Sequence, residues 1–331
     1  AAWPIWMWVI VLLGYSYVAS VLPVWTLLQP RDYINSLQLI SALSLIVFGL
    51  VVAALFGYTP TGGEKQTLSM VAPAWDLNPK NAPVIFPFLF ITIACGAVSG
   101  FHCLVSSGTS SKQLKNETDA RFVGYGSMLT EGFLATLVIV ACGAGLGLGL
   151  AMKDGSMLTG QAAWAAQYGD WTAAGALAAK VGAFVQGSAN FLQALGLSSS
   201  VAIALMGVLV ASFAGTTLDT ACRLQRYVIQ ELAATLGGKV GVENATPAAP
   251  FALLQNKHGA TIFAVTIAAA MAAIPQGNAE WSLANTGKGG LTLWPLFGAT
   301  NQLLAGLSFM VITFYLWRRG RAIWFLVIPM F

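Results

Sequence analysis

Long apolar runs alternate with short polar or proline- and glycine-rich breaks along the chain. A bilayer core needs about 20 apolar residues per helix, and counting on that length predicts eight membrane-spanning helices. They lie near residues 3–28, 34–56, 84–105, 122–150, 172–195, 197–215, 260–274 and 291–317. A ninth run, residues 322–331, reaches the last residue of the sequence. The pattern therefore predicts one all-α, multi-pass membrane domain over residues 1–331.

The breaks between the runs have local causes. Pro30 is expected to end the first helix, and Asp32 is expected to cap the second by accepting backbone N–H bonds. Residues 59–83 and 237–259 are rich in proline and glycine, which predicts two irregular loops.

The segment 219–236 has a different pattern, because its apolar side chains share one helical stripe and its charges lie elsewhere. The stripe consists of Leu224, Tyr227, Val228 and Leu232. This pattern is typical of a helix that lies in the membrane interface, so we expect residues 219–236 to form a separate amphipathic helix.

The composition narrows the class of protein. Lys and Arg number 16 and Asp and Glu 12, so that 8% of the 331 residues are charged, against about 25% in soluble domains. A soluble protein of this size could not cover its surface with so few charges. The low charge content excludes a cytosolic enzyme, a nucleic-acid binder and a disordered regulator. It predicts that the protein is embedded in the lipid bilayer.

The chain begins at Ala1 inside an apolar run, without the basic stretch that opens a signal peptide. We therefore expect a piece of a longer protein. The four cysteines form no C-x-x-C pair and the two histidines lie far apart, so the sequence predicts no metal site, no cofactor and no catalytic residue.

The third run places polar residues at membrane depth, where an unpaired polar group costs several kcal/mol. They are Ser99, Gly100, His102, Ser106, Ser107 and Thr109. A glycine-broken helix with hydroxyl groups is typical of transporters, which line substrate cavities with the freed backbone groups, so these residues are candidate substrate ligands. The alternative is a G-x-x-x-G packing face of Gly96 and Gly100, with His102 bonded to a neighbouring backbone.

Glu131 lies nine residues into the run that starts at Phe122, about 14 Å along a helix. A carboxylate at that depth can hold a proton at neutral pH, and His102 is a second candidate for proton coupling. Alternatively, the helix begins later and the N-terminal dipole stabilises Glu131 in its first turn.

Two further clusters remain ambiguous. Ser212, Thr216 and Thr217 are expected at a helix end, where hydroxyl groups and freed carbonyls suit Na⁺, although Thr216 and Asp219 also have the spacing of a helix cap. Asn301 and Gln302 follow Pro295 and Gly298, which can kink a helix. Amides at that depth either join helices or line a substrate cavity.

Four segments resemble the carbon starvation protein A (CstA) family, and they occur in the family's order across nearly the whole chain. They are VLPVWTLLQPRDY (21–33), SGFHCLVSSGTSSKQLKNETDARFVGYGSMLTEG (99–132), SFAGTTLDTACRLQRYVIQEL (212–232) and LWPLFGATNQLLAG (293–306).

The resemblance implies a bacterial inner-membrane transporter for peptides, or for pyruvate with protons, within the amino acid–polyamine–organocation (APC) superfamily. Its LeuT-like core would hold two inverted five-helix repeats, with residues 99–102 in the second broken helix and Ser212, Thr216 and Thr217 near the sodium site. Family members carry earlier membrane segments, so we expect the other half of the site from the same or another chain.

The sequence thus predicts uptake of peptides or small carboxylates coupled to H⁺ or Na⁺. One alternative is a membrane-embedded nutrient sensor or scaffold, which would dock a partner through residues 219–236 and the basic residues 318–321. Another is an intramembrane hydrolase that uses Ser99 and His102, although no acidic residue is placed to orient the histidine.

Overall fold

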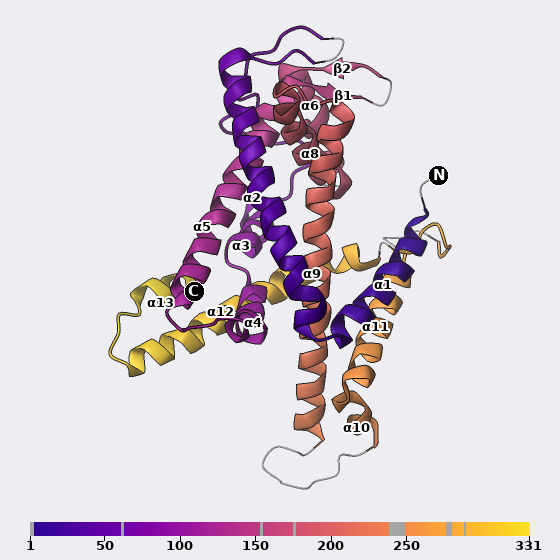
Figure 1. The fold of residues 1–331 in the computed structure, drawn as a ribbon, viewed down its shortest axis with the longest axis vertical. Helices are drawn as coiled ribbons and strands as arrows, with labels where there is room; N and C mark the ends of the chain where they lie inside the picture. Colours follow the sequence, from indigo (N-terminus) through magenta and orange to yellow (C-terminus); the bar gives the residue numbers. More distant parts are fainter. Residues whose placement is uncertain are drawn as a thin grey trace. The chain divides into compact units, whose positions relative to one another are not determined.

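The computed structural model describes residues 3–60, 63–152, 155–174, 177–237, 249–275, 280–287 and 289–331. Within these ranges most residues are helical, and β1 (Leu150–Ala151) pairs antiparallel with β2 (Met157–Leu158) (Figure 1). Five helical stretches of these ranges are long and apolar enough to cross a membrane: Val24–Phe56, Ile85–Lys112, Asp119–Leu148, Ser199–Leu236 and Leu296–Arg318. Two shorter apolar helices have 17 residues each.

The α-helices of the described residues differ widely in length, from four residues in α7 to 38 in α9. In chain order they are α1 (Ile5–Val21), α2 (Val24–Phe56), α3 (Phe90–Ala97), α4 (Gly100–Gly108), α5 (Asp119–Val140), α6 (Gly160–Tyr168), α7 (Trp171–Ala174), α8 (Leu177–Ala194), α9 (Ser199–Leu236), α10 (Ala249–Gln255), α11 (Lys257–Ala273), α12 (Trp294–Arg318) and α13 (Trp324–Met330).

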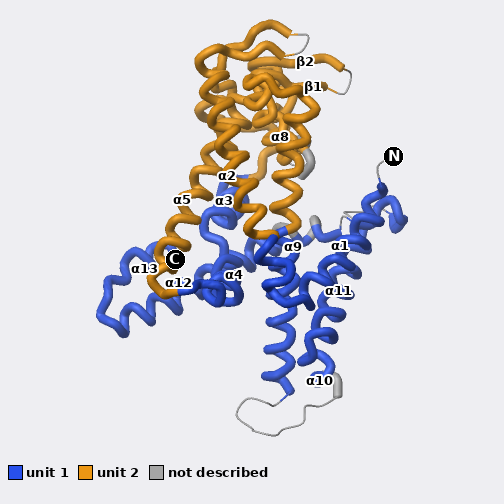
Figure 2. Tube along the Cα trace, in the orientation of Figure 1, with its two compact units in different colours: residues 1–30, 84–115, 216–331 blue, residues 31–83, 116–215 orange. Residues whose placement is uncertain are grey.

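The chain divides into two compact units, each assembled from separated stretches of sequence (Figure 2). Unit 1 consists of residues 1–30, 84–115 and 216–331, and unit 2 of residues 31–83 and 116–215. In unit 1, α1 packs along α11, and α12 packs against α3, α4 and α13.

The core of unit 2 is closely packed around α8. Phe191 is fully buried, and Asn190 donates to the carbonyls of Gly145 and Gly149 at 2.9 and 2.7 Å. A Cβ atom at Gly187 would meet the carbonyl oxygen of Ala141, so this helix contact requires glycine. The buried members of the core are Leu43, Ile46, Ala53, Leu137, Ala141, Leu148, Ala189, Phe191, Leu192, Ala202, Met206 and Leu209.

The first helix ends earlier than predicted. Leu22 is extended (φ −65°, ψ 150°) before Pro23, because a residue that precedes proline avoids the helical region. Pro30 and Asp32 lie inside α2, so the predicted stop at Pro30 and the predicted cap at Asp32 are wrong. Asp32 instead accepts from Arg31 at 3.0 Å.

The two predicted loops differ in outcome. The described part of residues 59–83 contains no helix, and Tyr58 pairs with Gln66 in an isolated bridge. This irregular loop is confirmed. A π-helix follows at Ile85–Leu89. Of residues 237–259, the stretch 238–248 lies outside the described residues, and α10 and the start of α11 occupy much of the remainder, where the prediction of a loop is wrong.

Residues 219–236 are helical, but they continue α9 rather than form a separate element. The predicted span 197–215 and the predicted amphipathic helix 219–236 therefore belong to one helix of 38 residues. The buried side of its second half includes charged residues, since Asp219 and Arg223 are 0% and 2% exposed beside the buried Leu224, while Leu232 is 55% exposed. The position of this segment at the membrane interface stays a prediction.

Candidate substrate and ion sites

The third apolar run is a broken helix. α3 ends at Ala97 and α4 begins at Gly100, and between them Val98 (φ −134°, ψ 69°) and Ser99 (φ −79°, ψ 126°) leave the helical region. The predicted break is thereby confirmed. It leaves backbone carbonyls at the end of α3 and N–H groups at the start of α4 without partners inside their own helices.

Asn301 of α12 fills this break. Its Oδ1 accepts from the backbone N–H of Phe101 at 2.7 Å, and its Nδ2 donates to Ser99 Oγ at 2.9 Å and to Cys95 Sγ at 3.1 Å. Asn301 is 5% exposed. Of the two interpretations of this amide, the contacts are those of a side chain that joins helices.

Gly100 brings α4 close to α12. A Cβ atom at Gly100 would meet the carbonyl oxygen of Asn301 and, at 2.6 Å, the backbone nitrogen of Ala305. Gly96 has open space where its Cβ would lie. The alternative interpretation is a G-x-x-x-G packing face of Gly96 and Gly100. The structure shows a close helix contact at Gly100 and none at Gly96 among the described residues.

The hydroxyl groups beyond the break are bonded within α4 or its end. Ser106 and Ser107 donate to the carbonyl of Cys103 at 3.0 and 2.8 Å, and Thr109 donates to that of Val105 at 2.8 Å. Their oxygen atoms keep capacity to accept further bonds. His102 has an exposed side chain.

α12 begins differently from the prediction. Pro295 lies in its first turn, where proline fits a helix, so the predicted kink at Pro295 is wrong. Gln302 follows Asn301 on the helix, and its buried Nε2 has no hydrogen-bond partner in the part of the chain that the structure describes.

Glu131 lies well inside α5. The helix begins at Asp119, twelve residues earlier, so Glu131 is about 18 Å along the axis and the alternative that placed it in the first turn is wrong. Its side chain lines a groove of about 860 Å³ between α2, α5 and α9, beside Ser127 and Thr130. Both hydroxyl groups donate to carbonyls one turn earlier, at 2.6 and 2.9 Å.

Ser212, Thr216 and Thr217 do not lie at a helix end, because α9 runs through all three. The premise of freed carbonyls for Na⁺ is therefore wrong, although an ion-binding role for the three hydroxyl groups stays a prediction. Ser212 donates to Asn35 Oδ1 at 2.6 Å. The alternative helix cap at Asp219 is wrong for the same reason.

Sequence reasoning missed a buried polar cluster between α1 and α9. The Tyr15 hydroxyl donates to Asp219 Oδ2 at 2.7 Å, and Arg223 donates to the carbonyls of Ala19 and Leu22 at 2.7 and 2.8 Å. Arg223 thus satisfies carbonyls at the C-terminal end of α1. The signal was Asp219 and Arg223 at i and i+4, a spacing that places both on one helix face.

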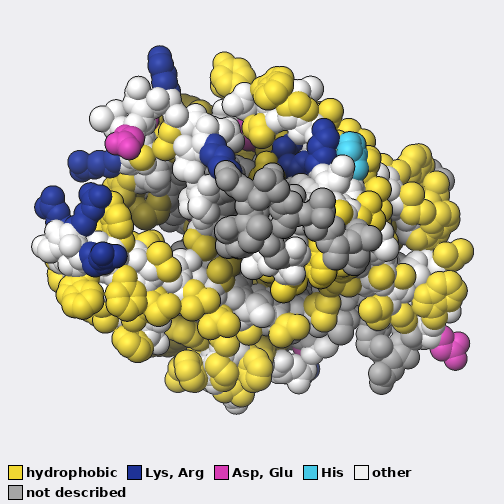
Figure 3. All heavy atoms as spheres, turned by 90° about the horizontal axis from the view of Figure 1, so that it is seen from below, with side chains coloured by type: hydrophobic (Ala, Val, Ile, Leu, Met, Phe, Trp, Pro, Cys, Tyr) yellow, Lys and Arg dark blue, Asp and Glu magenta, His cyan; other side chains and the backbone are white. Residues whose placement is uncertain are grey.

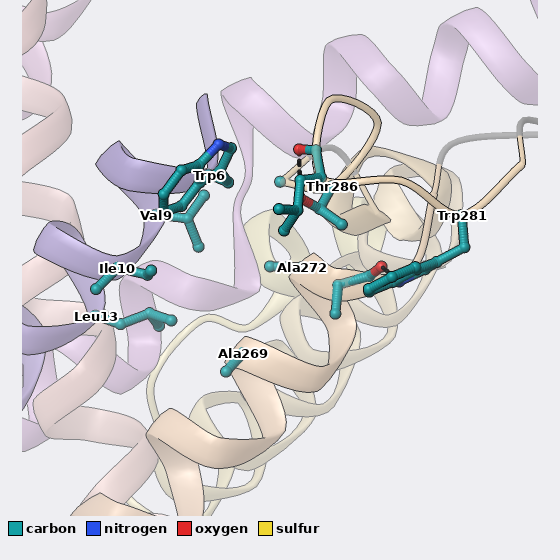
Figure 4. Close-up of a pocket in the computed structure, with 11 residues that line it drawn as sticks. Trp6, Val9, Ile10, Leu13, Ala269, Ala272, Trp281 and Thr286 are labelled. Carbon is teal, nitrogen blue, oxygen red and sulfur yellow. Dashed lines mark hydrogen bonds between the residues drawn. The ribbon is translucent and has the colours of Figure 1, made fainter. Parts of the chain in front are cut away.

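An apolar pocket of about 220 Å³ lies between α1 and α11. Figure 4 shows Trp6 and Ile10 of α1 on one side and Ala269 of α11 and Trp281 on the other. The Thr286 hydroxyl donates its hydrogen to the backbone carbonyl of Leu283 at 2.9 Å and is not free to donate it to a ligand in the pocket. This pocket suits an apolar group rather than a carboxylate.

Comparison with known proteins covers nearly the whole chain. A family model described as "Carbon starvation protein CstA" matches residues 3–331. The chain is 33% identical to the "Peptide transporter CstA" of Helicobacter pylori J99 over 94% of this chain and 45% of that protein. It is 34% identical to the "Pyruvate/proton symporter BtsT" of Escherichia coli K12, over 96% of this chain and 48% of that protein.

The chain also matches the "Peptide transporter CstA" of Escherichia coli K12, with 32% identity over 96% of this chain and 46% of that protein. It thus spans a little under half the length of these curated relatives. No solved structure matches it. The relatives' names together with the long apolar helices identify a multi-pass membrane protein.

Proposed function

The chain belongs to the carbon starvation protein CstA family, and on this premise we propose that it forms part of a secondary active transporter. The transporter would carry small peptides, or small carboxylates such as pyruvate, into the cell across the bacterial inner membrane. The observation that carries the proposal is the helix break at Val98 and Ser99 inside an apolar span. Broken helices at membrane depth are tolerated where they line a substrate cavity.

Both substrate classes contain a carboxylate, and the start of α4 suits one. The N–H groups of a helix N-terminus and the positive end of its dipole attract an anion. Asn301 Oδ1 now accepts from the N–H of Phe101. A substrate carboxylate would take that position, with Ser99 and Gly100 beside it. We propose that the other ligands come from polar side chains of α4, of the residue after its end and of α12: His102, Ser106, Ser107, Thr109 and Gln302.

We propose that Glu131 carries the coupling proton. It is an acidic side chain about 18 Å along an apolar helix, and it lines the groove beside Ser127 and Thr130. A proton neutralises such a carboxylate, which lowers the cost of moving it through an apolar surrounding. His102 is the second candidate for the proton. Sodium at Ser212, Thr216 and Thr217 has the weaker support, since α9 supplies no helix end there.

The proposed fold is the APC-type core of two inverted repeats. In this arrangement α3 and α4 form the broken helix of the second repeat, and α9 contributes to the ion site. The other half of the substrate site would come from membrane segments outside these residues, in the same or another chain.

Uptake into proteoliposomes tests the function. Labelled pyruvate and a labelled dipeptide would be supplied separately under an inward H⁺ gradient and an inward Na⁺ gradient. Accumulation of one substrate under one gradient names both the substrate and the coupling ion. Binding of a substrate without accumulation under either gradient would contradict transport and favour a membrane-embedded nutrient sensor.

A further inference from the structure

A small polar pocket lies in unit 1, where α2 begins and α4 ends beside α9. It holds about 150 Å³. Its walls include Trp25, Gln29, Thr109, Lys112, Gln113 and Tyr227. The lining thus combines two aromatic side chains with an ammonium group and two amides that can donate hydrogen bonds.

Two cations meet at the ring of Tyr227. The Lys112 ammonium lies 5.5 Å from the ring centre and the Arg226 guanidinium 4.7 Å from it. Arg226 is 6% exposed. In the part of the chain that the structure describes, no carboxylate forms an ion pair with Lys112 or Arg226. Lys112 lines the pocket and is exposed, whereas the buried Arg226 contacts the same Tyr227 ring without lining the pocket. A buried cation without a counter-charge is costly, so these two positive charges at Tyr227 favour an anion beside them.

The neighbouring charges on α9 already have other contacts. Asp219 accepts from the Tyr15 hydroxyl at 2.7 Å, and Arg223 donates to two carbonyls at the end of α1. The cluster of Lys112, Arg223, Arg226 and Asp219 therefore holds three cations and one carboxylate, and Lys112 is the cation that lines the pocket.

The surroundings of the pocket match the headgroup region of a membrane. Trp25 is 71% exposed, and exposed tryptophans beside apolar spans lie at the level of lipid headgroups. The contact of Lys112 with Tyr227 places the basic residues after α4 at the same end of unit 1 as those of α9. Figure 3 shows Lys and Arg side chains at several places on the face seen from below, among hydrophobic side chains. An excess of basic residues marks the cytoplasmic side.

We propose that this pocket binds the phosphate group of an acidic phospholipid of the cytoplasmic leaflet, with Lys112 as its main charged contact. Basic pockets between membrane helices bind such headgroups through the same combination of charge and hydrogen-bond donors. The aromatic wall of Trp25 and Tyr227 would lie against the glycerol region of the lipid. The inference does not depend on which substrate is transported.

Native mass spectrometry of the purified protein in detergent tests the site, with phosphatidylglycerol and phosphatidylcholine added in turn. We expect the protein to prefer phosphatidylglycerol and Lys112→Gln to lower that affinity about fivefold, the effect of one basic residue near a membrane surface. Lys112→Arg should retain the affinity. Lys115→Gln removes an exposed charge three residues away and is the matched control, with no change expected.

Three results would overturn the proposal. They are equal binding of the two lipids, equal losses in Lys112→Gln and Lys115→Gln, and displacement of the lipid by an equal concentration of glycerol 3-phosphate, which would indicate a site for a free phosphate ester. If Lys112→Gln does not fold, Gln113→Glu tests the same pocket by adding a negative charge. Unchanged binding of phosphatidylglycerol to that variant also overturns the proposal.

Discussion

At Asn301, one amide side chain forms three hydrogen bonds to the broken helix, with Phe101, Ser99 and Cys95. Its neighbour Gln302 has a buried Nε2 without a partner. Removal of the two adjacent amides should therefore change the stability of the protein differently. Loss of the Asn301 amide leaves other buried polar groups unsatisfied, whereas loss of the Gln302 Nε2 group does not.

We expect Asn301→Leu to destabilise the protein by about 1–3 kcal/mol, because the N–H of Phe101 loses its acceptor. Gln302→Leu, which removes a buried amide N–H group with no partner among the described residues, should be neutral or stabilising. Thermal unfolding in detergent, followed by circular dichroism, measures both changes. Equal losses in the two variants would show that the hydrogen bonds of Asn301 do not hold the break.

Glu131→Gln should abolish proton-driven accumulation of substrate while exchange of substrate across the membrane continues, because glutamine cannot carry the proton. The measurement is uptake and counterflow in proteoliposomes under an inward H⁺ gradient. Glu117→Gln serves as the control, since this exposed carboxylate precedes α5. Uphill uptake at the normal rate in Glu131→Gln would exclude the proton role.

At the scale of elements, the contact between α4 and α12 depends on a glycine. A Cβ atom at Gly100 would meet backbone atoms of Asn301 and Ala305, whereas one at Gly96 would meet nothing within 4 Å. Neither glycine has a positive φ, so the space around each Cβ, rather than backbone strain, decides the effect of a substitution.

Gly100→Ala should therefore cost about 1–3 kcal/mol through overpacking and should reduce transport, since α12 must move away from the break. Gly96→Ala should stabilise α3 by about 0.5–1 kcal/mol, because alanine loses less backbone entropy in a helix. The midpoints of thermal unfolding of the two variants are compared with that of the parent protein. A stabilising Gly100→Ala would contradict the close contact.

The second element-scale feature is the continuous helix α9. Residues 212–219 contain Gly215 but no proline, and a single glycine costs a helix only about 1 kcal/mol. The bonds of Asp219 and Arg223 to α1 hold the second half of α9 with a charged face buried. Of the amphipathic stripe, Leu224 is buried while Val228 and Leu232 are exposed, because the stripe counts apolar residues and not long-range partners.

At the scale of the whole molecule, Asp170 ties segments of unit 2 that are distant in sequence. Its carboxylate accepts from the backbone N–H of Thr172 at 2.8 Å and from Asn81 at 3.0 Å, and Lys80 lies 3.6 Å away. The hydrogen bond from the Thr172 backbone, followed by that from Asn81, lowers the pKa of Asp170 from its ordinary value.

Because this pKa is lowered in the folded state, the stabilising contribution of Asp170 is present above the ordinary pKa of about 3.9. It is lost as the pH falls through the lower, folded-state pKa. We expect Asp170→Asn to unfold at a lower temperature than the parent protein at pH 7, with the difference shrinking below about pH 4. Unfolding midpoints between pH 7 and pH 3 measure it. A difference that stays constant or grows toward low pH would contradict the lowered pKa.

Features with local causes can be read from the sequence alone. The scarcity of charge and the length of the apolar runs established a helical membrane protein, since a bilayer accepts few other structures. The glycine and hydroxyl residues around position 99 located the broken helix, and proline content located the irregular loop after α2. These signals depend on the conformational and solvation costs of single residues, which a sequence shows directly.

Other features of the fold depend on contacts between segments that are distant in the sequence. Which side chains of α9 are buried, and which groups at the helix break are satisfied, depend on distant partners. Tyr15 and Asp219 are 204 residues apart, and Asn301 and Phe101 are 200 apart. Burial of a polar group is favourable only when such a partner is in place, and the folded chain alone brings those partners together.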